Sequence, residues 1–383
     1  MKIYQKHKYF TRRGSIAILA TFLMGMAANV MAVKFFSDSH DQFAAARVSA
    51  DGFRARQMAL GGFQAGLAAL KTVPEEYLYQ TGITLQPPDI QVSPDEDPVT
   101  GKCRPQCFIS YRIIPEDGKL NVNNLVLTSE DRPNAQYRQI FERFFVYYDV
   151  PVEVIDPIID WIDENTFVEG TGAESPYYDS LQPPRKIKNY RMFNLSEITS
   201  VKDIEYNMIF RSRAPEDWFE IQEELKFQTE DEKLLIQADD WIPANNLTAY
   251  IPYGERFEDK ININAARYHA LMSLSDSMTR EAVLALFKLR RKSGNYIKDV
   301  GALKDLPEFQ VQTPLDVTLY EELAGTGGQV SGIIKTEGDI WRIVGVGSIL
   351  PTSDNEEDAG GVVRKVTALY DKTNSRLIYY SED

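Results

Sequence analysis

The stretch TRRGSIAILATFLMGMAANVMAV, residues 11–33, decides how the rest of this 383-residue chain is interpreted. A basic leader ends at Gly14, and an uncharged, mostly apolar run begins at Ser15 and continues to Val33. A helix of this length extends roughly 28 Å, about the thickness of one bilayer core. No small-residue cleavage site follows the run, as it would in an ordinary signal peptide. Any cut is therefore expected before the run, which leaves residues 15–33 as a single membrane span.

The charges around this span predict its orientation. The leader carries five lysines and arginines and no acidic residue, and such positive charge stays on the cytoplasmic side of a membrane. The body is acidic, because 42 basic and 56 acidic residues give the whole chain a net charge of −14. An acidic body repels a phosphate backbone. We therefore expect the body outside the cytoplasm and no nucleic-acid partner.

Apolar residues continue at helical spacing beyond the membrane segment. They include Phe36, Phe43, Phe53 and Leu60, and no proline interrupts this region. The pattern predicts one helix over residues 15–73, with its first part in lipid and an apolar stripe on its second part. This stripe is expected to bind partner helices and the protein's own sheet.

Strand-like segments can cover the stripe. Residues 106–127 contain a β-rich run, a Pro-Glu-Asp-Gly turn and an alternating run, which predicts a hairpin. Residues 339–350, 362–370 and 377–380 have the same strand character. Together they predict an antiparallel sheet packed on the long helix, an α+β fold.

Between these strand segments, short helical patterns are separated by proline, asparagine and glycine. Residues 133–149 and 278–292 are two of them. They indicate a large all-α domain inserted into the sheet. The predicted domains are a leader (1–14), a long helix (15–73), the first part of the sheet (74–123), the inserted all-α domain (124–326) and the C-terminal strands (327–383).

One part of this insertion, residues 271–306, resembles a helix-hairpin-helix unit. DNA-binding versions carry glycines in the hairpin so that backbone N–H groups can approach a phosphate. Here the hairpin reads Ser275-Asp276-Ser277, and an aspartate repels phosphate. We therefore interpret these helices as a packing scaffold of the SAM or helix-hairpin-helix type.

The sharpest acidic cluster is DENTFVEGTGAE, which begins at Asp163. Asp163, Asn165, Glu169 and Glu174 occupy positions 1, 3, 7 and 12 of a twelve-residue span, as in a calcium loop. Position 6 lacks the glycine of an EF-hand, so two interpretations stay open. The segment is either a calcium loop of another type or a solvated acidic turn.

The two cysteines, Cys103 and Cys107, are four residues apart around a central proline. They are close enough in sequence for a disulfide in an oxidising compartment, and two unpaired thiols are the alternative. The three histidines lie in separate predicted elements, and no P-loop, G-x-S-x-G or H-E-x-x-H motif occurs. We therefore expect no enzyme activity.

Several motifs, in matching order over nearly the whole chain, resemble the type II secretion minor pseudopilin K family. They are the RRG leader junction, AAARVSADGFRARQMALGGFQAGLAAL, GKLNVNNL, DPIIDWIDEN with GAESPYY, PPR with LSEITSV, and ININAARYHALMSL. The resemblance implies a pilin-type fold with an inserted helical domain. The junction between Gly14 and Ser15 resembles the cleavage site of a prepilin-type leader, which implies cleavage there by prepilin peptidase and methylation of Ser15. It also implies calcium in the inserted domain, for which Asp163, Asn165, Glu169 and Glu174 are the candidate ligands.

The resemblance further implies a single-pass inner-membrane protein with a periplasmic body. Its partners would be minor pseudopilins I and J, other pseudopilins and the inner-membrane secretion platform, and its role would be to initiate or cap the pseudopilus tip that supports export of folded proteins. Most pilin-like subunits carry glutamate five residues after the cut, where it pairs with a neighbour's amino terminus, but this chain has Leu19. A subunit without that acid is suited to the tip. The alternative function is a minor pilin of a type IV pilus or competence system, handling adhesion or DNA.

Overall fold

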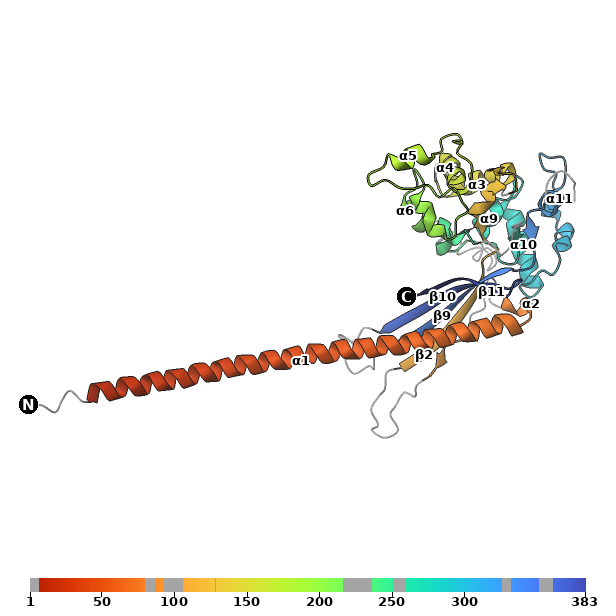
Figure 1. The fold of residues 1–383 in the computed structure, drawn as a ribbon. Helices are drawn as coiled ribbons and strands as arrows, with labels where there is room; N and C mark the ends of the chain where they lie inside the picture. Colours follow the sequence, from red (N-terminus) through yellow and green to blue (C-terminus); the bar gives the residue numbers. More distant parts are fainter. Residues whose placement is uncertain are drawn as a thin grey trace, which may run out of the picture.

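The computed structural model describes residues 7–79, 87–92, 106–127, 129–215, 236–250, 260–325, 332–350 and 361–383. Its dominant element is α1 (His7–Thr72), a helix of 66 residues that projects far beyond the body (Figure 1). The helix begins within the predicted leader, because the single glycine there does not interrupt it, so the predicted start at residue 15 is too late for the full chain. It ends just before Pro74, whose ring and missing N–H cannot continue a helix.

The second half of α1 packs on a five-stranded antiparallel sheet of order β1-β2-β9-β10-β11. The strands are β1 (Ile90–Gln91), β2 (Gln106–Pro115), β9 (Ile340–Leu350), β10 (Val362–Asp371) and β11 (Arg376–Glu382). The predicted C-terminal strands and the predicted α+β fold are therefore confirmed.

The predicted hairpin over residues 106–127 is wrong. β2 pairs with β1 and β9. The second run instead forms β3 (Leu120–Asn121), which pairs with β6 (Leu247–Thr248) of the insertion, and β4 (Val126–Leu127), which pairs with β5 (Arg132–Pro133). The pairing of β2 with β9 joins residues more than 220 positions apart in sequence. Local alternation cannot distinguish such a partner from the nearest run of strand-like sequence.

Glycines bring α1 very close to the sheet. A Cβ added at Gly347 of β9 would lie 2.1 Å from the backbone oxygen of Ala55, and one at Gly345 would lie 2.3 Å from that of Ala59. Both alanines are fully buried. On the helix side, a Cβ added at Gly62 would lie 2.5 Å from the backbone oxygen of Ser110 in β2. The helix therefore rests on the sheet with backbone against backbone.

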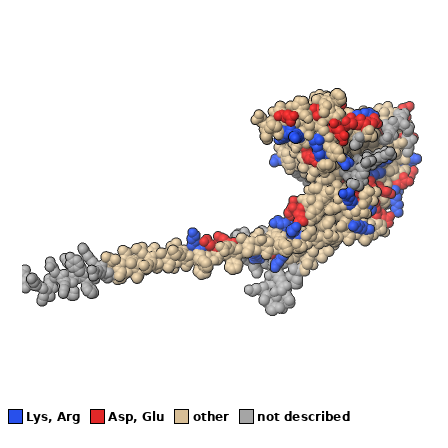
Figure 2. Space-filling model, in the orientation of Figure 1, with Lys and Arg blue, Asp and Glu red and all other residues tan. Residues whose placement is uncertain are grey.

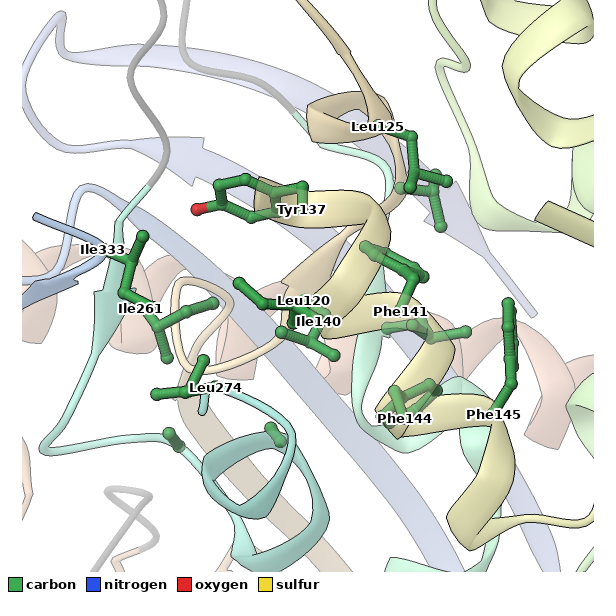
Figure 3. Close-up of a cluster of buried hydrophobic side chains, with 14 of the residues drawn as sticks. Leu120, Leu125, Tyr137, Ile140, Phe141, Phe144, Phe145, Ile261, Leu274 and Ile333 are labelled. Atoms are coloured by element: carbon green, nitrogen blue, oxygen red, sulfur yellow. The ribbon is translucent and has the colours of Figure 1, made fainter. Parts of the chain in front are cut away.

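The chain leaves the sheet after β2, builds a helical head, and returns at β9 (Figure 1). Large apolar side chains from segments far apart in the sequence form the core of this head, among them Phe141, Phe144 and Ile261 (Figure 3). Several short strands occur between the helices, so the head is not purely α-helical. Among the described residues, the remaining α-helices and strands are α2 (Glu75–Leu78), β4 (Val126–Leu127), β5 (Arg132–Pro133), α3 (Ala135–Tyr147), α4 (Ile155–Ile162), α5 (Ser175–Asp179), α6 (Tyr206–Phe210), β7 (Ile261–Asn262), α9 (Tyr268–Met272), α10 (Arg280–Lys292), α11 (Leu319–Ala324) and β8 (Ile334–Lys335).

Buried ion pairs lie where the chain enters and leaves the head. Glu116, just after β2, pairs with Lys119 (Oε2 to Nζ, 3.1 Å) and with Arg342 of β9. Burial alone would raise the pKa of Glu116, but the two cations lower it to about 2. Asp117 pairs with Lys335 (Oδ2 to Nζ, 2.6 Å) and accepts the backbone N–H of Ile340. These contacts fix the head on the sheet.

Candidate functional site

The acidic segment predicted as a calcium loop follows α4 and folds back along it. Every residue of α4 is buried, and its carboxylates Asp156 and Asp160 are four positions apart on one face. The N–H of Thr171 donates to Asp156 (2.9 Å), and the N–H of Glu169 donates to Asp160 (3.0 Å). The two aspartates therefore bind the backbone of the loop segment that runs back along α4.

The loop approaches α4 so closely that glycine is required at two positions. A Cβ added at Gly170 would lie 2.2 Å from Asp156 Oδ2, and one at Gly172 would lie 2.0 Å from Asp160 Oδ2. Gly170 also has a φ of +46°, in the left-handed region that favours glycine. The glycines of the sequence G-T-G therefore place this loop over the carboxylates.

Several oxygens in this region are buried without a hydrogen-bond donor. They are Oδ2 of Asp160, Oδ1 of Asp163, Oε1 of Glu174 and Oδ1 of Asn189. Burial, together with the neighbouring acids, raises the pKa of Asp163 to about 8, and burial also raises that of Asp160 to about 6. Carboxylate and amide oxygens are the ligands that Ca²⁺ prefers. The donor set therefore fits a calcium ion, whose charge would offset the repulsion between these acids.

The structure groups most of the predicted ligands. Asn165 donates to Oδ2 of Asp163 (2.9 Å), and Asn189 donates to the backbone oxygen of Asn165 (2.8 Å) and to Oε2 of Glu174 (3.3 Å). Glu169 contributes its backbone N–H, while its side chain is half-buried. As the side chains stand, no three His, Cys, Asp or Glu groups among the described residues can hold a metal ion. A bound cation would therefore draw the carboxylates closer together.

Two members of this cluster were missed in the sequence interpretation. Asp160 precedes Asp163 by three positions, a spacing that places both on one face of a helix, and this signal was available. Asn189 lies fifteen positions after Glu174, and only the tertiary fold brings it to the loop.

The second candidate site is the uncovered part of α1. Residues 16–33 are exposed and apolar enough to cross a membrane, with a mean hydropathy of 2.1 over the most apolar window. Figure 2 shows no charged side chains along this first described part of the projecting helix. Leu19 is 58% exposed within it. The composition and exposure of this segment fit a single membrane anchor.

Beyond the anchor, the predicted assembly residues divide into two groups. Phe36, Phe43 and Phe53 are between 61% and 78% exposed, whereas Leu60 packs partly into the interface between helix and sheet. Phe36 and Phe43 are seven positions apart and share one face of the helix, and water-exposed phenylalanines on one face indicate a surface that another protein covers.

The predicted processing and disulfide positions lie at the edge of what the structure describes. The backbone of Gly14 and Ser15 is part of α1. Cys103 lies outside the described residues, whereas Cys107 is in β2 opposite Ile349 of β9. The Cys103–Cys107 disulfide therefore stays a prediction.

Residues 118–213 match the family described as type II secretion system (T2SS), protein K. This segment is similar to a protein K domain. It contains α3, α4, the acidic loop, α5 and α6, so the candidate calcium site lies inside it. The predicted resemblance to the minor pseudopilin K family is confirmed.

Two further comparisons agree with the protein K domain. The chain is 28% identical over 122 residues to type II secretion system protein K of Aeromonas hydrophila, a match that covers 30% of this chain and 36% of that protein. The chain thus matches about a third of the length of that relative. The crystal structure of the GspK-GspI-GspJ complex from the enterotoxigenic Escherichia coli type 2 secretion system contains a chain with the same fold. The TM-score is 0.51 at 13% identity, over 90% of this chain and 99% of that one.

Proposed function

We propose that this chain is a minor pseudopilin of type II secretion that initiates or caps the periplasmic pseudopilus at its tip. Its partners would be minor pseudopilins I and J, and the assembly would support export of folded proteins across the outer membrane. The role is structural rather than catalytic. The observation that carries the proposal is the arrangement of α1, whose apolar first half is uncovered while its second half packs on the sheet that carries the head.

The proposal includes a maturation step and a location. Prepilin peptidase would cut after Gly14, and Ser15 would become the methylated amino terminus. The protein would then be a single-pass inner-membrane protein with its body in the periplasm, where it would meet the other pseudopilins and the inner-membrane secretion platform. The basic leader and the acidic body support this orientation.

Leu19 and the head both favour the tip over the shaft. A leucine cannot form an ion pair with the amino terminus of a subunit added above it. The head is also a large body next to the sheet (Figure 1), and a bulky head fits the end of a helical stack better than a repeating position. A tip subunit needs lateral contacts with its partners along α1, and it needs no contact with a further subunit above it.

The proposal is tested by co-purification with minor pseudopilins I and J of the same organism. Phe36→Asp combined with Phe43→Asp should abolish co-elution, because both side chains lie on one exposed face and a buried charge there has no partner. Ala45→Asp is the matched control, since nine residues at 100° each place it on the opposite side of the helix from Phe36. Intact complex in the double variant would reject the assembly surface.

Processing is tested separately with Gly14→Ala. Co-expression with prepilin peptidase should shorten the unaltered chain, visible as a shift on a gel, and should leave the Gly14→Ala chain at full length. Equal processing of both chains would contradict the proposed cleavage site.

We also propose that the acidic loop binds Ca²⁺ through Asp160, Asp163 and Glu174, with amide oxygens of Asn165 and Asn189. A bound calcium ion supplies positive charge that holds the loop on α4. Calcium should raise the melting temperature of the detergent-solubilised chain relative to chelator, and Asp163→Ala should remove the difference. Asp179→Ala, an exposed acid at the end of α5, is the control that keeps it. Equal melting with and without chelator would reject the site.

A further inference from the structure

One short segment, residues 189–194, connects the acidic loop with the joint between head and sheet. Its first residue, Asn189, donates to the backbone oxygen of Asn165 (2.8 Å) and to Oε2 of Glu174 (3.3 Å). Its last four residues line a groove of about 460 Å³ whose other wall belongs to β11. Figure 2 shows the recess over which the head projects. A displacement of Asn189 therefore displaces one wall of this groove.

A buried amide attaches this wall to the part of the head that faces the sheet. The side chain of Asn123 donates to the backbone oxygens of Met192 (3.0 Å) and Ala249 (2.8 Å) and accepts the N–H of Met192 (2.7 Å). Asn123 is 5% exposed, so breaking these bonds would leave buried polar groups without partners, at a cost in free energy. Met192 and Ala249 therefore move together.

The next residue along the chain, Tyr250, reaches the sheet. Tyr250 is buried, and its ring lies 5.9 Å from the ring of Tyr379 in β11. It also shares a small apolar cluster with Ile340 of β9 and Leu369 of β10. Side-chain contacts and short backbone segments thus connect the acidic loop to the edge strand β11.

The acidic loop itself has different energies with and without a cation. Asp160, Asp163 and Glu174 are at most 3% exposed, and each has an oxygen that finds no hydrogen-bond donor within the described part of the chain. A bound ion offsets the repulsion between these carboxylates and keeps Glu174 in contact with Asn189. Without the ion, the buried charges repel one another, which favours an opened loop. Opening removes the hydrogen bond between Asn189 and Glu174.

We propose that calcium in the acidic loop controls how firmly the head is held against β11. The bound ion fixes Asn189, residues 189–194 then keep the groove wall in place, and Asn123 and Tyr250 carry this order to the sheet. Removal of the ion loosens the wall and the contact between Tyr250 and Tyr379. This inference rests on the proposed calcium site and gives that site a regulatory role.

The test is hydrogen–deuterium exchange, measured by mass spectrometry on the full chain in detergent micelles with calcium and with chelator. Calcium should slow backbone exchange about tenfold in residues 189–194, 247–250 and 376–379, because local opening of these segments becomes less favourable. Residues 108–113 of β2 are the internal control, since they belong to the same sheet and lie outside the groove. Their exchange should be the same in both conditions.

Two variants interrupt the connection at different points. Asn123→Ala separates the groove wall from residues 249–250, so calcium should still bind and should no longer slow exchange at 376–379. Tyr379→Ala removes the last contact, and its partly buried position makes it the variant that keeps the fold. It should retain the calcium effect at 247–250 and lose most of it at 376–379.

Tyr380→Ala is the matched control for Tyr379→Ala. The ring of this neighbouring tyrosine lies 6.0 Å from that of Phe63 in α1, and Tyr380 is not part of the groove lining. Calcium should therefore slow exchange at 376–379 in the Tyr380→Ala protein as much as in the unaltered chain.

Calcium titration by calorimetry on the same proteins separates this inference from the calcium site on which it rests. Absence of calcium binding would reject the site and the coupling together. Calcium binding without slower exchange at 376–379, or with equal slowing at 108–113, would reject the coupling alone. A full calcium effect at 376–379 in the Tyr379→Ala protein would also overturn it.

Discussion

Because α1 lies so close to the sheet, we predict opposite effects on stability when two adjacent glycines of the helix are replaced by alanine. Both Gly61 and Gly62 lie in the interior of the helix, so replacement by alanine gives each the same gain in helix stability, about 0.5–1 kcal/mol. They differ in what the new methyl group meets. At Gly61 the nearest atom is Cδ1 of Ile109 at 3.8 Å, whereas at Gly62 it is the backbone oxygen of Ser110 at 2.5 Å.

The geometry sets the sign and size of the difference. Ordinary contact begins at 3.4 Å, so Gly62→Ala must move helix and sheet apart by about 0.9 Å. Overpacking of this kind costs about 1–3 kcal/mol. Gly61→Ala should therefore stabilise the protein slightly, and Gly62→Ala should destabilise it. Gly347→Ala should destabilise the protein more than Gly62→Ala, because the added Cβ would lie 2.1 Å from the backbone oxygen of Ala55. Since Gly347 is in a strand, the substitution also brings no gain in helix stability.

The assay is thermal unfolding of the full chain in detergent micelles, followed by circular dichroism. The Gly62→Ala protein should melt roughly 1–4 °C below the Gly61→Ala protein. Pulldown with the partner pseudopilins is a second readout, since a shifted helix presents its phenylalanines at an altered angle. Equal melting temperatures for the two alanine variants would refute the argument that backbone contact positions α1.

Two further predictions concern buried charge. Lys335→Met should lower the free energy of unfolding by about 3–5 kcal/mol, because it leaves the carboxylate of Asp117 buried without its cation. The control is Lys365→Met, at an exposed lysine. Equal denaturation midpoints for the Lys335→Met and Lys365→Met proteins would contradict the pairing. Burial among aromatic rings, including that of Trp241, lowers the pKa of His269 to about 4. The unfolded state therefore binds this proton first, so the stability due to neutral His269 is complete above about pH 6.5 and is lost as the pH falls towards 4. Between about pH 6.5 and pH 4, the melting temperature of the His269→Leu protein should fall less steeply with pH than that of the unaltered chain. Equal slopes for the two proteins would exclude His269 as a cause of the loss of stability.

The sequence predicted those elements whose pattern is local and long. Residues 15–73 contain no proline, and the C-terminal strands alternate strongly, so both follow from spacing alone. The predicted hairpin failed because β2 pairs with β9 across the whole head, and no local signal encodes that partner. The acidic loop was found from its composition, but Asn189 joins it only through folding.

The sequence by itself determined a chain with a basic leader, one apolar span and an acidic body, because charge and hydropathy act residue by residue. The tertiary structure alone decided where the surfaces lie. It turned the glycines of β9 into a backbone contact with α1, exposed Phe36 and Phe43, and left β11 as an edge facing the head. These features depend on which distant segments pack together, and packing is a property of the whole fold rather than of any stretch within it.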